Sequence, residues 1–164
     1  MSTQRKLTAL LGACAITGAL NAASTHAGET TATPAAAGYQ MAAVIDRARG
    51  NIVLAGDYDR AIAKLGGRPR ADFESSTNLC VAYTMTGAME QADAACAAAL
   101  ASSQETEVRR DIAVALSNLG VVKAVKGDLS GARRDFSRAL ELESDLRQAS
   151  KNLQRLRSVA PADA

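Results

Sequence analysis

The side chains of this sequence best suited to chemistry are three cysteines, Cys14, Cys80 and Cys96, and a single histidine, His26. No Cys-x-x-Cys spacing occurs, which disfavours a redox-active dithiol that exchanges disulfides. Cys80 and Cys96 are therefore either the two ends of a structural disulfide or two free thiols that pack as small apolar residues.

Familiar catalytic motifs are missing from the sequence. It contains neither a phosphate-binding Gly-x-x-x-x-Gly-Lys loop nor a Gly-x-Ser-x-Gly nucleophile elbow. The carboxylate pair Asp57 and Asp59 is accounted for as a helix cap, and the pair Glu141 and Glu143 as a solvated helix end. The sequence thus predicts a protein that is not an enzyme and that needs no cofactor and no metal.

Residues 1–27 have the plan of a secretory signal peptide. Arg5 and Lys6 form a short basic start, residues 7–20 form an apolar run too short to span a membrane, and small residues lead to Ala27. We therefore expect cleavage near Ala27 and a periplasmic or secreted protein. No later stretch predicts a transmembrane span.

A second interpretation of this leader is a lipoprotein box at residues 11–14, in which Cys14 would be lipidated at the outer membrane. The residues after Cys14 stay apolar, as though the hydrophobic core of a signal peptide continues through the cysteine. This continuity favours ordinary secretion over lipidation.

Removal of the leader makes the chain formally neutral, because lysine plus arginine falls from 19 to 17 and the acidic residues number 17. A neutral chain with few aromatic residues is poorly suited to binding nucleic acid. His26 leaves as well, and with it any histidine triad or histidine–zinc site.

A helix–turn–helix pattern occupies residues 116–142. Small residues stand where two antiparallel helices would approach closely, bulky ones stand where the space between hairpins must be filled, and a Gly-Asp pair separates the two helices. The key positions are Leu116, Leu119, Gly120, Gly127, Asp128, Ala132, Phe136, Ala139 and Leu140.

This pattern resembles the tetratricopeptide repeat, a 34-residue helix–turn–helix unit with an aromatic-x-x-Leu-Gly and a later Ala-x-x-x-Phe signature. Leu116, Lys123 and Ser144 stand where the signature has Trp, Tyr and Pro, and the other key positions agree. The resemblance implies a scaffold that works by protein–protein contact.

Two earlier copies of the unit precede it. One constant offset aligns the second copy with the third, and a shorter offset aligns the first with the second. The first copy would place Ile45, Ala48 and Ile52 on a buried helix face, and its second helix should stop at residues 66–69, Gly-Gly-Arg-Pro. The matched pairs are Leu79 with Leu119, Cys80 with Gly120, Gly87 with Gly127, Ala92 with Ala132, Cys96 with Phe136, Gly56 with Gly87, and Ala61 with Ala92.

The predicted fold is all-α: a short right-handed α-solenoid of about three helix–turn–helix hairpins and a C-terminal capping helix. The repeat domain covers residues 39–158, with a disordered lead-in at residues 28–38 and a flexible tail at residues 159–164. Ser102-x-x-Glu105 resembles a capping box and predicts a helix from near Ser103 to about Lys126. The capping helix has an apolar face of Leu146, Ala149, Leu153 and Leu156 and a basic outer face of Arg147, Lys151, Arg155 and Arg157.

The second copy brings the two later cysteines together. Its turn lies at Gly87 and Ala88, with Cys80 seven residues before Gly87 and Cys96 eight residues after Ala88. Residues equally far from the turn of an antiparallel hairpin face each other, and the family frame also places both cysteines on the facing sides of the hairpin. We expect a disulfide between them, and the alternative is a pair of buried free thiols.

In tetratricopeptide repeats the first helix of each hairpin lines a concave groove, so the resemblance implies a partner-binding groove here. The groove positions are uncharged and fit an extended or helical apolar peptide; the alternative is that they pack under neighbouring helices. The expected function is an exported scaffold for protein–protein interaction in the cell envelope, with a structural subunit of an envelope assembly or a redox-active dithiol protein as alternatives. The groove residues are Val81, Thr84, Met85, Ser117, Val121 and Ala124.

Overall fold

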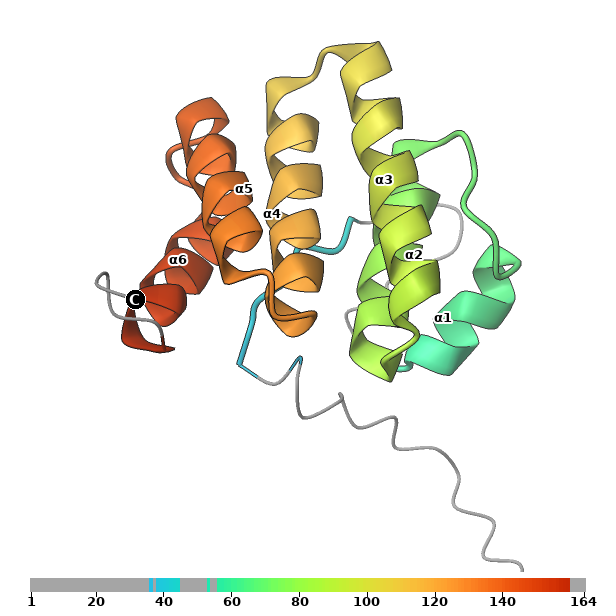
Figure 1. The fold of residues 1–164 in the computed structure, drawn as a ribbon. Helices are drawn as coiled ribbons and strands as arrows, with labels where there is room; N and C mark the ends of the chain where they lie inside the picture. Colours follow the sequence, from blue (N-terminus) through green and yellow to red (C-terminus); the bar gives the residue numbers. More distant parts are fainter. Residues whose placement is uncertain (1–35, 37, 45–52, 54–55, 160–164) are drawn as a thin grey trace, which may run out of the picture.

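The computed structural model describes residues 36, 38–44, 53 and 56–159 (Figure 1). These residues contain six helices and no strand, so the predicted all-helical class is confirmed. The predicted signal peptide, the helix positions Ile45, Ala48 and Ile52, and residues 160–164 lie outside the described residues. The helices are α1 (Tyr58–Leu65), α2 (Phe73–Thr86), α3 (Met89–Thr106), α4 (Arg109–Val125), α5 (Leu129–Leu142) and α6 (Arg147–Val159).

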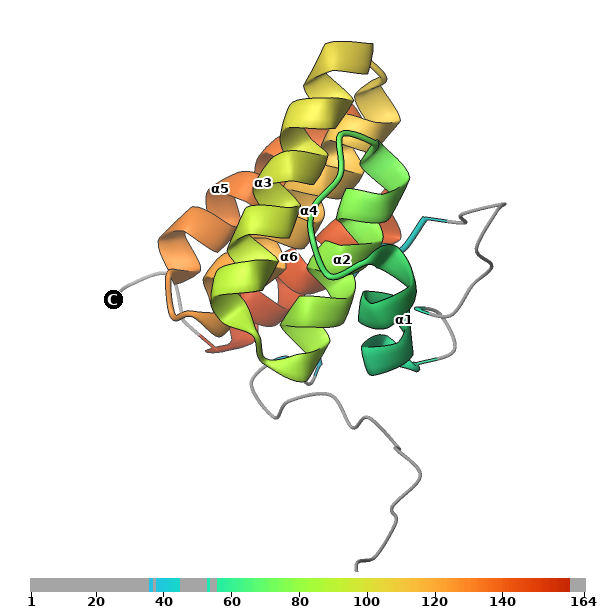
Figure 2. The same cartoon turned by 90° about the vertical axis from the view of Figure 1, so that its right-hand side faces the viewer.

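The helices from α2 to α6 form two layers. Helices α2, α4 and α6 make up an inner layer, in which neighbouring members touch, and α3 and α5 make up an outer layer (Figure 2). Among the described helices α3 and α5 do not touch each other, so the helices of the outer layer are spaced further apart than those of the inner layer. Of these helices, α1 packs on α2 alone.

Predicted helix ends are found where the Gly-Asp pairs stand. Asp57 and Asp128 are N-caps, and their carboxylates accept hydrogen bonds from the amides of Arg60 at 3.3 Å and Gly131 at 2.8 Å. Gly87 ends α2 in the left-handed conformation, with φ at 83°, which glycine adopts without strain. The end of α1 is also as expected, because the chain leaves the helix at residues 66–69.

The predicted start of the long helix near Ser103 is wrong. Ser102 and Ser103 lie inside α3, and the chain reverses at Glu107, whose φ is 57°. The two hydroxyls do not cap free amides: that of Ser103 donates to the Leu100 carbonyl at 2.8 Å, and that of Ser102 donates to the Ala71 carbonyl at 3.1 Å. Bonding to carbonyls keeps serine compatible with a helix interior, and this use of the hydroxyl has no local sequence signature.

Close approach between helices occurs where small residues predicted it. A Cβ atom on Gly120 of α4 would lie 2.7 Å from the ring of Phe136 on α5. Ala132 and Ala139 of α5 are fully buried, and so is Phe136. Glycine at position 120 therefore lets the aromatic ring lie directly on the backbone of α4.

Helix α6 buries most of the predicted apolar face: Ala149 and Leu156 are fully covered and Leu153 is half-buried, while Leu146, also buried, immediately precedes the helix. It packs with α5 and α4, and its last turn ends at Val159. Within the part of the chain that the structure describes, no helix combines the length and the hydrophobicity needed to cross a membrane.

Candidate functional site

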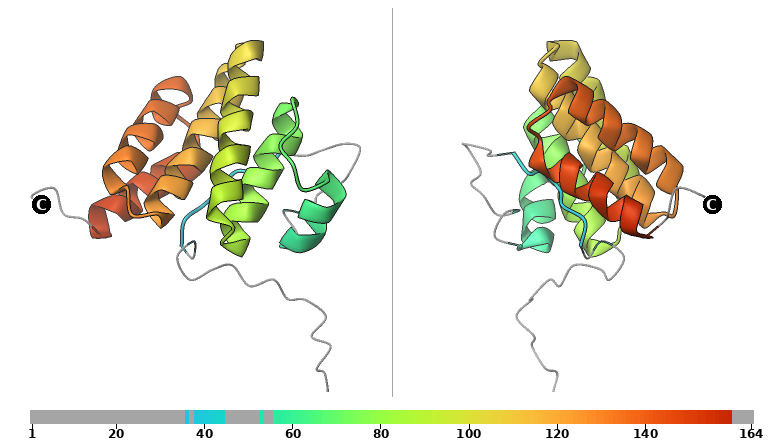
Figure 3. Two further views of the ribbon diagram at one scale, coloured as in Figure 1. Left: turned by 45° about the vertical axis from the view of Figure 1, so that its right-hand side comes forward. Right: turned by 90° about the vertical axis from the view of Figure 1, so that its left-hand side faces the viewer.

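An extended stretch of chain crosses the inner layer. Residues 38–44, which we call the strap, run past α6, then α4, then α2, in the reverse of the chain order of these helices (Figure 3). The strap contains no helix. Residues 39–44 belong to the stretch 39–158 that the sequence assigns to the helical repeat domain, yet they are extended.

Three asparagines hold the strap, one from each helix of the inner layer. Asn118 of α4 accepts from the amide of Ala42 at 2.9 Å and donates to the carbonyl of the same residue at 2.8 Å. Asn152 of α6 does the same for Gln40, at 2.8 and 2.7 Å, and Asn78 of α2 does so for Val44, at 3.0 and 2.9 Å. The three asparagines are 4 % exposed or less, so they are fixed in the interior.

The spacing of the clamped residues follows from strand geometry. Side chains of an extended chain alternate between two sides, and every second backbone unit presents its N–H and C=O to the same side. Asparagine carries one donor group and one acceptor group on its amide, which suits both backbone groups of one residue. Hence one asparagine per inner helix binds residues 40, 42 and 44 in turn.

The strap side chains pack on two sides of the clamped backbone. Ala42 and Val44 pack in a cluster with Phe73 of α2 and with residues of α4 such as Val114 and Leu116. Tyr39 and Met41 instead pack against the cluster that contains Val121, Phe136 and Leu156. Met41 also packs against the clusters that contain Cys80 and Val81, so the strap contacts all four clusters of the described interior and joins them.

The start of the strap is shaped by a glycine and an arginine. Gly38 has φ at 92°, and a Cβ atom there would run into the guanidinium group of Arg155. That guanidinium lies over the ring of Tyr39, 5.1 Å from its centroid, a cation–π arrangement. Arg155 thus contacts the strap, whereas the sequence placed it on the basic outer face of α6.

The six predicted groove residues all lie on α2 and α4, the inner-layer helices that the strap crosses. Val81, Thr84, Ser117, Val121 and Ala124 are buried, and Met85 is half-buried. Met85 and Val81 pack near Met41 and Ala43 of the strap, while Val121 is fully buried beside Phe136. The chain itself therefore covers the surface on which the sequence placed a partner.

Two buried hydroxyls of the inner layer are unpaired within the described part of the structure. They belong to Thr77 and Ser117, each of which immediately precedes a clamping asparagine. Thr84, one helical turn beyond Cys80, instead donates to the Cys80 carbonyl at 2.7 Å. The inner layer therefore keeps polar groups next to the clamping asparagines that are not used in holding the strap.

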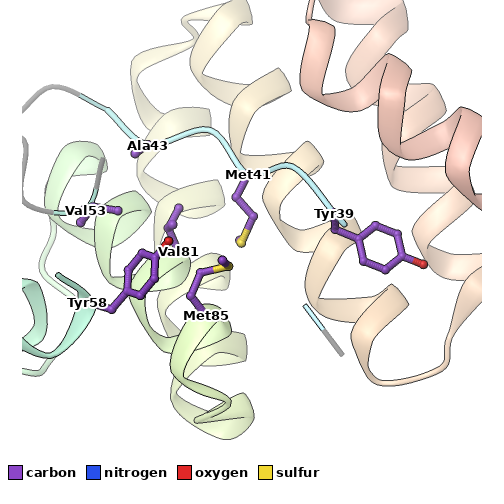
Figure 4. A pocket seen from close by; sticks show the side chains of 7 residues that line it. All are labelled: Tyr39, Met41, Ala43, Val53, Tyr58, Val81 and Met85. Carbon is purple, nitrogen blue, oxygen red and sulfur yellow. The ribbon is translucent and has the colours of Figure 1, made fainter. Parts of the chain in front are cut away.

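A cavity of about 160 Å³ lies beside the strap at the α1–α2 end. Met41, Ala43, Tyr58, Val81 and Met85 line it together with Tyr39 and Val53 (Figure 4). In Figure 4 the sulfur atoms of Met41 and Met85 point toward each other across this space. The lining side chains carry no charge.

Three charged residues towards the ends of α4 interact with neighbouring helices. Asp111, in the first turn of α4, has a pKa raised above its ordinary value, first by burial and then by the negative charge of Glu74. Lys123 forms an ion pair with Asp135 of α5 at 2.6 Å, and Lys126 forms one with Asp93 of α3. These two ion pairs link the inner layer to the outer layer, and neither involves a clamping asparagine.

The two cysteines lie at the contact between α2 and α3. The structure brings the sulfur atoms of Cys80 and Cys96 within bonding distance, with Cα atoms 4.8 Å apart, inside the range that a disulfide spans. Both residues are fully buried. They fill the position that Gly120 and Phe136 fill between α4 and α5, as the alignment of the second copy with the third predicted.

The clamping asparagines are the functional residues that the sequence reasoning missed. A signal was present: the dipeptide Asn-Leu occurs at residues 78–79, 118–119 and 152–153. The interval between its last two occurrences equals the nominal length of a tetratricopeptide repeat. The three asparagines make the same pair of hydrogen bonds to the strap from α2, α4 and α6.

In comparisons with known proteins, no family model, no curated protein and no solved structure matches the chain.

Proposed function

We propose that this protein is an exported, non-enzymatic scaffold of the tetratricopeptide type whose inner layer binds an extended peptide. The observation that carries the proposal is the row formed by Asn78, Asn118 and Asn152, each bonded to both backbone groups of alternate strap residues. The leader in the sequence supports a place for this scaffold in the cell envelope.

The chemistry of the row suits peptide recognition. The hydrogen bonds from the asparagine side chains to backbone N–H and C=O groups require an extended backbone but no particular side chain, so they give affinity without selecting a sequence. Selectivity comes from pockets for alternate side chains. Each buried bond contributes about 0.5–1.5 kcal/mol, and leaving such a group unpaired costs about 1–3 kcal/mol. Six bonds across three helices therefore hold a strand firmly once its backbone fits.

The strap sets the condition for binding a partner. Because the strap is part of the same chain, its binding is intramolecular and competes with that of any partner segment. A partner segment must displace it, either through better side-chain contacts or after the strap has been released.

A variant that releases the strap tests the proposal. Ala42→Pro removes the amide that donates to Asn118 while keeping the extended backbone that proline favours. A fluorescent peptide with the sequence of residues 36–44 should bind the full Ala42→Pro chain in an anisotropy titration, and bind the wild-type chain at least tenfold more weakly. Circular dichroism checks that the helices remain.

The matched controls separate the asparagine row from the rest of the surface. In the Ala42→Pro background, Asn118→Leu should abolish peptide binding, whereas Gln154→Leu, on the exposed side of α6, should leave it unchanged. Failure of the peptide to bind a folded Ala42→Pro chain would contradict the proposal.

That negative result would favour a second candidate, a structural subunit of an envelope assembly. The observation in its favour is that the strap already covers the inner layer and pairs with every clamping asparagine. In that case the strap is a permanent part of the fold, and a partner would contact another surface and remain attached through a high-salt wash.

A further inference from the structure

The strap does not fill the groove evenly along its length. At Ala42 the packing is close, with the side chain 8 % exposed among residues of α2 and α4. At Ala43, one residue later and on the opposite side of the backbone, the cavity of about 160 Å³ remains (Figure 4). An engineered enclosed apolar cavity of about 150 Å³ accommodates benzene, so this space, which is partly open to solvent, has the volume for an aromatic ring.

Three of the seven residues that line this cavity lie in helices. Tyr58 comes from α1, and Val81 and Met85 come from α2, while Tyr39, Met41 and Ala43 belong to the strap. A segment that replaced the strap would take these three strap side chains away with it and would meet Val53, Tyr58, Val81 and Met85. Those four residues offer apolar and aromatic surface without a charge, and the flexible side chain of Met85 repacks easily around a new neighbour.

We infer that the peptide the groove takes from a partner carries a bulky apolar side chain, aromatic or large aliphatic, at the position of Ala43 and a small one at the position of Ala42. This inference rests on the proposed function and names the class of peptide that it concerns. The clamped positions, which correspond to Gln40, Ala42 and Val44, cannot be proline, because each donates its amide hydrogen to an asparagine.

The inferred side chain also explains how a partner could displace the strap. The clamps bind any extended backbone equally, so the strap and a partner gain the same six hydrogen bonds and these cancel in the exchange. Filling the cavity is a contact that the partner makes and the strap does not. Burial of one large apolar side chain would then offset part of the advantage that the strap has as a segment of the same chain.

Three peptides and one protein test the inference. The full-length chain with Ala42→Pro is titrated with the peptide of residues 36–44 and with the same peptide carrying either Ala43→Phe or Ala42→Phe. We expect the Ala43→Phe peptide to bind at least tenfold more tightly than the parent peptide, and the Ala42→Phe peptide to bind at least tenfold more weakly.

The outcomes distinguish the inference from the proposed function. If the parent peptide binds and the Ala43→Phe peptide binds no more tightly, the groove binds peptides but the cavity is not a side-chain pocket, and the inference is overturned. If none of the three peptides binds, the proposed function fails and the inference fails with it.

A second measurement needs no separate peptide. In the full chain with its own strap in place, Ala43→Phe should raise the melting temperature because the ring fills the cavity, and Ala42→Phe should lower it because that site is closely packed. A lower melting temperature for both variants would show that neither side of the strap has room and would overturn the inference.

Discussion

An asparagine side chain satisfies both backbone groups of one extended residue, which a lysine cannot do because it has no acceptor. At position 118 the asparagine is 1 % exposed and its two partners are the N–H and C=O of Ala42. Because both groups would be left without partners in a buried site, Asn118→Leu should lower the free energy of unfolding by about 2–4 kcal/mol. Urea denaturation of the full chain measures this change.

A double-mutant cycle shows whether the loss belongs to the strap. In the Ala42→Pro chain the strap no longer depends on Asn118, so Asn118→Leu should then cost less than half as much. Equal losses in the two backgrounds would mean that Asn118 stabilises the helices and not the strap.

Gly120 is the second residue whose identity is dictated by a contact. Alanine there would place a methyl group 2.7 Å from the ring of Phe136, which is overpacked. Overpacking costs about 1–3 kcal/mol, and alanine returns up to about 1 kcal/mol through its higher helix propensity. We expect Gly120→Ala to destabilise the chain by about 1–2 kcal/mol in chemical denaturation.

The shape of the neighbour provides the control for Gly120. Combining Gly120→Ala with Phe136→Leu should cost less than the sum of the single changes, because the smaller side chain makes room for the methyl group. Strict additivity would contradict a direct clash.

At the scale of the helix, the N-cap of α5 links stability to pH. Hydrogen bonds from the amide of Gly131 and from Ser130 lower the pKa of Asp128 below its ordinary value of 3.8. A lowered folded-state pKa means that this carboxylate stabilises the fold above the unfolded pKa and stops doing so as pH falls through the folded one. Asp128→Ala should therefore lower the melting temperature at pH 7, and the difference from wild type should shrink below about pH 3.8.

The conservative variant isolates the charge of Asp128 from its cap. Asparagine is as good an N-cap as aspartate, so Asp128→Asn should keep most of the stability at pH 7 while losing the acid-dependent part. If the difference in melting temperature between the wild type and Asp128→Asn were the same at pH 7 and at pH 2.5, this assignment would be contradicted.

The α2–α3 hairpin is the element that the cysteines join. A disulfide that closes a loop of this size contributes roughly 3 kcal/mol when the entropy of the unfolded chain is considered. Reduction of the intact protein should lower the melting temperature by several degrees. The double variant Cys80→Ala, Cys96→Ala should melt at the same temperature with and without reductant. Free thiols on both residues in protein isolated without reductant would contradict the bridge.

Helix ends were predictable where a single residue determines them. Gly87 and Asp128 act through their own backbone or side chain, so their types were enough. Ser102 and Ser103 were misread because a serine hydroxyl serves a free amide or a carbonyl with the same sequence around it. The two serines lie inside α3 because the chain reverses only at Glu107. Glutamate rarely adopts positive φ, so its residue type did not predict a reversal there.

Across the whole molecule, the pairing of helices was predictable and the strap was not. The hairpins arise from a repeated local pattern, whereas the strap is bound by residues 34, 76 and 112 positions away. No periodicity in residues 38–44 reports such partners, because the bonds use their backbone. The recurrence of Asn-Leu in three helices was the only sequence signal of the clamp. It identifies the three asparagines but does not predict that they bind residues 40–44.

Amide exchange reports on the strap as a whole. The N–H groups of Gln40, Ala42 and Val44 each donate to an asparagine, so we expect them to exchange slowly, although they lie in a segment without helix or strand. Their protection should disappear in the Ala42→Pro chain, while the amides in the middle of α4 remain protected. Rapid exchange at all three positions in the wild type would mean that the strap is not held.

The reversed direction of the strap has a consequence for the order in which the protein is completed. The strap precedes every described helix in the chain, yet the asparagine that holds its first clamped residue lies on the last of them. Until α6 has packed in place, the backbone groups of Gln40 lack their asparagine, and an extended segment in that condition can pair with other chains. A chain truncated before α6 would keep the backbone of Gln40 without this partner. The last helix therefore completes the array and also protects the start of the strap from pairing with other chains.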